Sequence, residues 1–313
     1  MRKGNEVILL AAVAADLLLH LAFKDLLSRH WFFDLTNHFR PYEVIGLVLI
    51  AGWCIFRLSR KAALVFFALT TAGLGLAHYQ AQPAIHPAPG QGVGVQVISF
   101  NVYTDNQRKA DVVKWIESSL ASDRINLVFI MEADRKWISA LRSLKTRLPY
   151  LIEHPREDNF GLALYSDVPL DDVRVKEFDS IGMPGIWGLI KNRSIRLAGV
   201  HAVPALAPDG LKLRTEYYQN LRAGLDAEKI PTLLFGDFNC TPWSANLKIA
   251  TEGLNDSFGG LFRPHTWSPF GGLLSIPIDY VFYSPHFVLR SARVGPDLGS
   301  DHLPLVVSTE LAM

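Results

Sequence analysis

Apolar residues gather in three long runs near the start of the chain, whereas beyond residue 94 apolar and polar positions alternate over much shorter distances. The runs occupy residues 7–23, 44–56 and 62–79, and the third contains no charged residue. A helix of about 20 apolar residues crosses a bilayer, and basic or aromatic residues at its ends suit the interfaces. We therefore predict a membrane anchor of three transmembrane helices within residues 1–79.

Two other interpretations of this apolar segment stay open. Residues 1–15 have the pattern of a cleaved signal peptide, because two basic residues precede an apolar stretch with small residues at its end. The segment would also suit a soluble helical domain, although the uncharged run at 62–77 disfavours it.

Basic residues near the ends of the predicted spans indicate an orientation. Five would lie on the cytoplasmic side: Arg2, Lys3, Arg57, Arg60 and Lys61. Three would lie on the other side of the membrane. Three spans that start inside leave the C-terminal domain outside the cytoplasm. We expect an integral protein of a bacterial inner membrane with this domain on the periplasmic side.

A change of composition separates the anchor from the rest of the chain. Residues 80–94 are rich in Ala, Pro, Gln and Gly, and three prolines prevent a helix from continuing. We interpret residues 80–94 as a linker and residues 95–313 as one domain, which is long enough to bury a large core.

Polar residues follow the short apolar runs of this domain. Buried strands are predicted at residues 95–102, 127–131, 195–200 and 232–235. The polar residues at their ends are Asn101, Glu132, His201 and Asp237, and a further strand over 278–283 carries Asp279. Because loops at strand ends leave side chains free to face a ligand, we expect these groups to converge at one edge of a sheet.

The residue types at these positions indicate metal-assisted chemistry. Hard oxygen ligands without thiolates suit Mg²⁺ or Mn²⁺, and the candidates are Asn101, Glu132, Asp237, Asn239 and Asp301. His201 and His302 add groups that exchange protons near neutral pH. Phosphoester hydrolysis needs this combination of a cation, a base for the attacking water and an acid for the leaving oxygen.

Charge and cysteine content narrow the alternatives. Residues 1–94 hold 8 basic and 5 acidic groups of the 31 and 30 in the chain, so the rest carries 23 against 25. Nonspecific nucleic-acid binding usually draws on clustered Lys and Arg, and no such excess is present. The two cysteines, Cys54 and Cys240, imply no disulfide framework.

Short motifs in this domain resemble those of the endonuclease/exonuclease/phosphatase superfamily. They are GDFN at 236–239, IDYVF at 278–282, SDHLP at 300–304, SFN at 99–101, ME at 131–132 and VH at 200–201. Six motifs in family order span nearly all of the domain. The resemblance implies a four-layer α/β sandwich, in which two packed β-sheets are flanked by helices.

The resemblance also implies roles for the polar residues. Asn101 and Glu132 would help to position the metal, with Asp301 as a further metal-site carboxylate. Asp237 and Asn239 would hold the metal, the attacking water and the scissile phosphate.

The two histidines would handle the protons. His302, oriented by Asp279, would be the general base or the imidazole that polarises the phosphate. His201 would bind the phosphate or protonate the leaving group, and no carboxylate partner for it is evident before Gly161.

These observations predict a membrane-anchored, divalent-metal-dependent hydrolase of a lipid or a small extracytoplasmic phosphoester. The alternatives are a DNA or RNA nuclease of the same fold and a membrane-anchored binding module without catalysis. Beyond the lipid bilayer and the phosphoester substrate, no protein partner is predicted.

Overall fold

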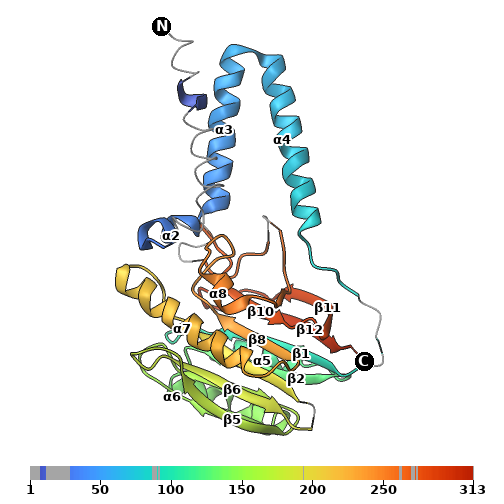
Figure 1. The fold of residues 1–313 in the computed structure, drawn as a ribbon. Helices are drawn as coiled ribbons and strands as arrows, with labels where there is room; N and C mark the ends of the chain where they lie inside the picture. The colour runs from blue at the N-terminus through green and yellow to red at the C-terminus, as the bar shows by residue number, and fades with distance from the viewer. Residues whose placement is uncertain are drawn as a thin grey trace.

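The computed structural model describes residues 8–11, 29–86, 90, 92–192, 194–260, 263–268, 272 and 274–312. Its central feature is a pair of six-stranded sheets (Figure 1). The first has the order β11 (Phe287–Val294), β12 (Leu305–Leu311), β1 (Gly94–Asn101), β2 (Ile125–Met131), β4 (Leu162–Ser166) and β3 (Tyr150–His154). The second has the order β5 (Leu170–Glu177), β6 (Pro184–Ile190), β7 (Ile195–His201), β8 (Thr232–Asp237), β10 (Asp279–Tyr283) and β9 (Asn255–Asp256).

The central strands are apolar on both faces because both faces are covered. In β1, Val97 points into the core between the two sheets, whereas its neighbour Ile98 packs under the helices on the outer side. Phe129 and Phe235 meet across the inner core with ring centroids 5.3 Å apart. This two-sided burial explains why the strands appear in the sequence as continuous apolar runs.

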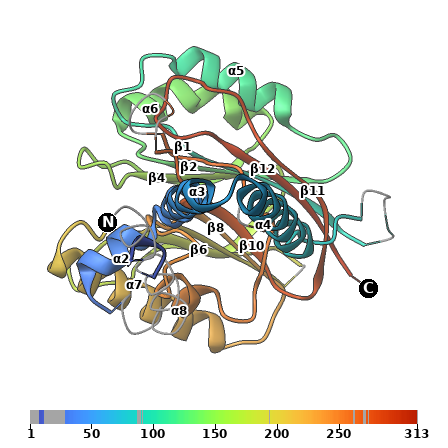
Figure 2. The ribbon, with the colours of Figure 1, turned by 90° about the horizontal axis from the view of Figure 1, so that it is seen from above.

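Helices cover the outer face of each sheet (Figure 2). The first sheet is covered by α5 (Lys109–Ser119), α6 (Arg135–Ala140) and the 3₁₀ helix η1 (Leu141–Thr146), and the second by α7 (Pro208–Asp226) and α8 (Leu247–Thr251). The buried residues of α7, Tyr217 and Leu221 among them, recur at helical spacing and pack on β7 and β8. Two packed mixed sheets between helices confirm the predicted sandwich.

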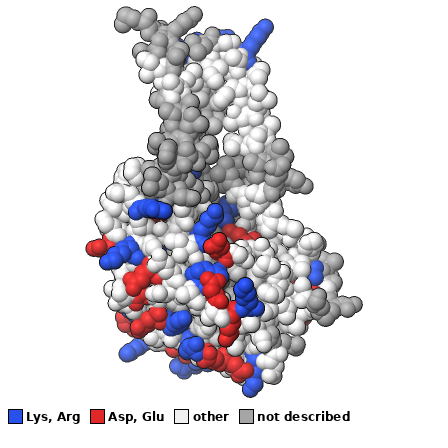
Figure 3. All heavy atoms as spheres, viewed as in Figure 1, with Lys and Arg blue, Asp and Glu red and all other residues white. Residues whose placement is uncertain are grey.

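The N-terminal helices lie at one end of this sandwich. After α2 (Trp31–Asn37), α3 (Arg40–Leu58) and α4 (Arg60–Gln80) form an antiparallel hairpin that projects from the sheets (Figure 1). Gly52 allows the close approach of the two helices, because a Cβ there would overlap the Phe67 ring. On the face drawn in Figure 3, charged side chains gather on the globular part, and the described part of the hairpin is mostly neutral.

The predicted spans map unevenly onto these helices. The span at 7–23 falls largely outside the described residues, and those at 44–56 and 62–79 fall on α3 and α4. Among the helices that the structure describes, none passes by itself as a membrane span in length and apolarity. The pair of α2 and α3, bent by 72°, meets the criterion when taken together. Three transmembrane helices are therefore not supported.

Strand register brings the polar strand ends to one edge. One pair of strands is parallel in each sheet, β1 with β2 in the first and β7 with β8 in the second. In the second pair, His201 lies opposite Asp237. The antiparallel β10 begins at the same edge, with Asp279 opposite Asp237. Asn101 lies opposite Met131, directly before Glu132. The two sheets thus present these side chains to a common space.

We expect a methyl group at Gly236, the residue before Asp237, to damage this edge. Gly236 has φ 134°, and a Cβ would overlap the Val200 carbonyl oxygen of β7. Gly253 also has a positive φ, 76°, but its Cβ would meet nothing within 4 Å, so Gly253→Ala is the matched control. In chemical denaturation, Gly253→Ala should cost about 1 kcal/mol of unfolding free energy, and Gly236→Ala about 2 kcal/mol more. An equal loss of unfolding free energy in the two variants would contradict the close approach of β7 to β8 at Gly236.

Candidate active site

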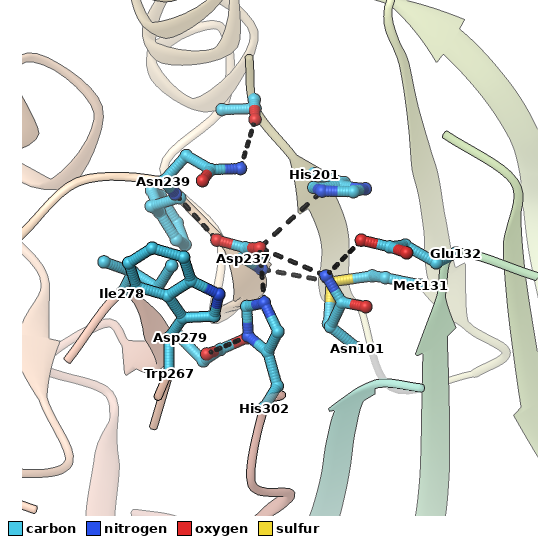
Figure 4. A network of polar contacts seen from close by, with 12 residues as sticks. Asn101, Met131, Glu132, His201, Asp237, Asn239, Trp267, Ile278, Asp279 and His302 are labelled. Carbon is cyan, nitrogen blue, oxygen red and sulfur yellow. Dashed lines mark hydrogen bonds and ion pairs between the residues drawn. The ribbon is translucent and has the colours of Figure 1, made fainter. Parts of the chain in front are cut away.

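Asp237 lies at the centre of the polar cluster, with only 1% of its surface exposed (Figure 4). Its Oδ1 accepts a hydrogen bond of 2.7 Å from the Asn239 backbone N–H, and its Oδ2 accepts one of 3.3 Å from the Asn101 amide. The Nε2 atoms of His201 and His302 lie 3.6 and 3.7 Å from the same Oδ2. Burial, with Asp279 nearby, raises the pKa of Asp237.

Asp279 and His302 form a buried pair. The Asp279 Oδ2 lies 2.9 Å from the His302 Nδ1, and the hydroxyl of Thr266 accepts the Asp279 backbone N–H at 3.1 Å. Burial alone would lower the pKa of His302, but the carboxylates of Asp279 and Asp237 outweigh it and raise the pKa to about 10. Since Nδ1 is bonded to Asp279, the other ring nitrogen, Nε2, faces Asp237.

Glu132 is held on the opposite sheet by a strained turn. Its φ of 59° is rare for a residue with a side chain. The Asn101 amide donates to Oε1 at 3.1 Å, and the Thr104 backbone N–H donates to Oε2 at 3.2 Å. Burial raises the pKa of Glu132, and these two hydrogen bonds oppose the shift. Thr104 belongs to none of the motifs in the sequence, so its hydrogen bond to Glu132 was not predicted.

Asp301 completes the group of acids. Its Oδ2 accepts a hydrogen bond of 2.9 Å from the Trp267 indole N–H. Its Oδ1 is buried and has no hydrogen-bond partner among the described residues. Trp267 therefore orients an acid of the site.

The amides of Asn101 and Asn239 are arranged differently. The Asn101 NH₂ donates to two carboxylates and its oxygen accepts the Tyr103 N–H at 3.2 Å, so this side chain orients the acids. The Asn239 NH₂ donates to the Ala202 carbonyl at 2.9 Å, and its oxygen has no partner among the described residues.

The acids of the site fit a divalent cation. No Lys or Arg in the described part of the chain pairs with Glu132, Asp237 or Asp301, although buried carboxylates require compensation. Ligand atoms of Asp237, Asp279 and His302 also lie within 4.8 Å of one another. Because the Asp279 Oδ2 is bonded to His302, the carboxylate oxygens available to a cation are those of Glu132, Asp237 and Asp301. An oxygen-rich set with an unpartnered oxygen suits a hard cation.

His201 is neutral by virtue of its surroundings. Burial, with His302 nearby, lowers its pKa to about 3. The ring packs against Phe160 with centroids 4.8 Å apart, and its buried Nδ1 has no partner among the described residues. Asp158 opposes the pKa shift but is bonded to Arg156. The carboxylate sought before Gly161 is therefore present nearby, but it does not hold the imidazole.

A cleft of about 400 Å³ is lined by many of these residues, among them Glu132, His201, Asp237, Asn239, Asp301 and His302. Asn101 and Asp279 are not among its lining residues. The lining also includes Leu35, His38 and Phe39, which come from α2 and the turn after it. No sequence signal identified the N-terminal residues as part of the site, because their contribution depends on how α2 docks.

Comparisons with known proteins agree with this geometry. Residues 98–302 match the model of the endonuclease/exonuclease/phosphatase family. The chain belongs to this family, whose members are metal-dependent phosphoesterases, and is therefore an enzyme of that class. No curated protein matches the chain significantly.

Solved structures share the fold at low sequence identity. A family member from Bacteroides vulgatus is 19% identical with a TM-score of 0.57, over 70% of this chain and 99% of that one. A 3′-5′ exonuclease from Neisseria meningitidis is 16% identical with a TM-score of 0.55, over 70% and 100%. Sphingomyelinase C from Streptomyces griseocarneus is 15% identical with a TM-score of 0.51, over 69% and 99%.

We expect Asp279→Asn to lower kcat by about 10²–10⁴-fold, because the amide cannot stabilise a charged His302. The pKa of His302 should fall for the same reason. The measurement is steady-state hydrolysis of bis(4-nitrophenyl) phosphate with saturating Mg²⁺. Asp171→Asn, on the exposed outer strand β5, is the matched control and should keep wild-type activity. A kcat for Asp279→Asn within threefold of wild type would contradict the role of the pair.

Proposed function

We propose that this protein is a membrane-anchored, Mg²⁺-dependent hydrolase of a lipid or small extracytoplasmic phosphoester. The observation that carries the proposal is the convergence of two histidines and three acids, none with a Lys or Arg partner among the described residues, on one cleft at the shared edge of the sheets. Glu132, Asp301 and Asp237 would hold the cation. Mg²⁺ suits them because it accepts one or two carboxylates and keeps positions for water and a phosphate oxygen.

The side chains divide the chemical work. When bound, the cation would neutralise charge on the phosphate oxygens and make a bound water more acidic. Asp237 orients the attacking water and takes its proton, and His302, whose raised pKa keeps the imidazole charged at neutral pH, donates from Nε2 to the phosphate. Asp279 stabilises this imidazolium and fixes the ring. The neutral His201 and the amide of Asn239 contact the phosphate and the leaving oxygen.

The hairpin of α3 and α4 is the proposed anchor. Its large apolar side chains are strongly exposed, with Trp53 at 61% and Leu64 at 72%. An apolar surface of this extent suits contact with lipid. Arg57 and Arg60 lie at the turn of the hairpin over the rings of Trp53 and Phe56, which suits a membrane interface. We propose an inner-membrane location with the sandwich on the periplasmic side.

Purified full-length protein should hydrolyse bis(4-nitrophenyl) phosphate and phospholipid in mixed micelles with Mg²⁺, and EDTA should abolish both activities. Asp237→Ala and His302→Ala should each lose about 10³-fold or more in kcat. Plasmid DNA is included in the same panel. Cleavage of DNA alone would favour the nuclease, and a wild type that cleaves nothing would favour the binding module.

The anchor makes a second prediction. Full-length protein should float with phosphatidylethanolamine/phosphatidylglycerol vesicles, and Leu49→Glu/Leu64→Glu should float markedly less, because charge is costly in the hydrocarbon. Ile181→Glu replaces an exposed apolar residue of the sandwich and is the matched control. Retained hydrolysis of soluble substrate shows that each variant is folded. Equal flotation of all three proteins would contradict the anchor.

A further inference from the structure

Helix α2 is fixed to the sandwich by buried polar contacts. Asp34 is fully buried, and its carboxylate accepts from the Arg214 guanidinium of α7 and from the Ser244 hydroxyl. The Nδ1 of His38 accepts the Thr241 backbone N–H at 3.2 Å. The neutral imidazole therefore carries its proton on Nε2, which lies 3.6 Å from Asp34. Polar pairing of this kind gives α2 a defined position.

The same contacts connect α2 to the catalytic loop. Arg214 bonds to Asp34 and also donates to the Asn239 carbonyl at 2.6 Å. His38 binds Thr241 two residues further on. The loop that presents Asn239 to the cleft is therefore clasped between α7 and α2.

Helix α2 and the turn after it contribute two apolar side chains to the cleft beside His38, whose Nδ1 is bonded to Thr241. Leu35 and Phe39, four residues apart, form an apolar wall of the cleft together with Leu206, Ile276 and Ile278. The same cleft is lined by His201, His302, Glu132, Asp237 and Asp301. Its lining therefore combines polar groups that suit a phosphate with apolar side chains that suit a hydrocarbon.

The charge of the lining disfavours nucleic acids as substrates. Among the described residues, none of those that line the cleft is a Lys or an Arg. Polyanions such as nucleic acids need several basic contacts to their phosphates. A single phosphoester attached to a hydrocarbon chain matches the lining better.

The location of the cleft supports the same conclusion. From α2 the chain continues through the turn at residues 38–39 into α3, so the apolar wall lies at the base of the hairpin (Figures 1 and 2). A lipid that rises only partly out of a bilayer beside the hairpin would reach this wall first.

We propose that the α2 wall, Leu35 and Phe39, binds the hydrocarbon portion of a membrane phospholipid whose phosphoester lies against Asp237 and His302. This inference rests on the proposed hydrolase function and names its substrate class. The wall selects substrates with long chains by burying them, and α2 is a specificity element of the active site.

The test compares kcat/KM for a long-chain and a soluble substrate. Dipalmitoyl phosphatidylglycerol in mixed micelles and bis(4-nitrophenyl) phosphate are assayed with Mg²⁺ and full-length protein. In Leu35→Gln/Phe39→Gln the ratio of lipid to soluble kcat/KM should fall tenfold or more, because amides bury hydrocarbon poorly. Phe32→Gln, on the exposed side of the same helix, is the matched control and should keep the ratio.

Three outcomes would overturn the proposal. An unchanged ratio in the double variant, whether both activities are kept or both fall by the same factor, would make α2 a purely structural element. A wild type that hydrolyses the soluble diester but not the lipid would refute the substrate class while leaving the hydrolase intact. A wild type that hydrolyses neither substrate would instead refute the proposed function.

Discussion

The buried carboxylate of Asp237 sets the main constraint on this structure, because a charge removed from water must be compensated by its neighbours. Asn101 contributes from the first sheet, and His201 and Asn239 contribute from the second. His302 approaches from the segment before β12. These groups reach Asp237 only if the two sheets end at the same edge of the sandwich. The packed inner core, where Phe129 meets Phe235, therefore determines the site as much as it determines stability.

Helix α2 extends this logic beyond the sandwich. A second buried charge, Asp34, is compensated by Arg214, which also holds the backbone of the Asn239 loop. The segment that leads into the hairpin is thus part of the catalytic architecture. The proposed anchor would place the phosphate site within reach of a bilayer surface, which would raise the local concentration of a lipid substrate.

The motifs predicted the sandwich through their resemblance to a family, and the local apolar pattern predicted the strand ends whose polar residues converge. Apolar runs long enough for buried strands end at Asn101 and Glu132, and register then brings such residues together. Contacts that depend on tertiary docking could not be predicted. Leu35 reaches the cleft only because Asp34, one residue before it, finds Arg214 some 180 positions later. The pairing of Thr104 with Glu132 depends on a strained turn that no motif marks.

Apolar runs predicted the structure of the N-terminal segment less well. Their length and composition predicted three spans, but among the described helices only the bent pair of α2 and α3 meets the criterion for a span.

The central claim is that the acids of the cleft share one divalent cation, and anomalous scattering from crystals grown with Mn²⁺ tests it most directly. The account predicts a Mn²⁺ peak in the cleft, about 2 Å from a carboxylate oxygen of Glu132 and in contact with Asp237 or Asp301. A cleft without a Mn²⁺ peak at concentrations that support hydrolysis, or Mn²⁺ bound only to acids outside the cleft, would contradict it.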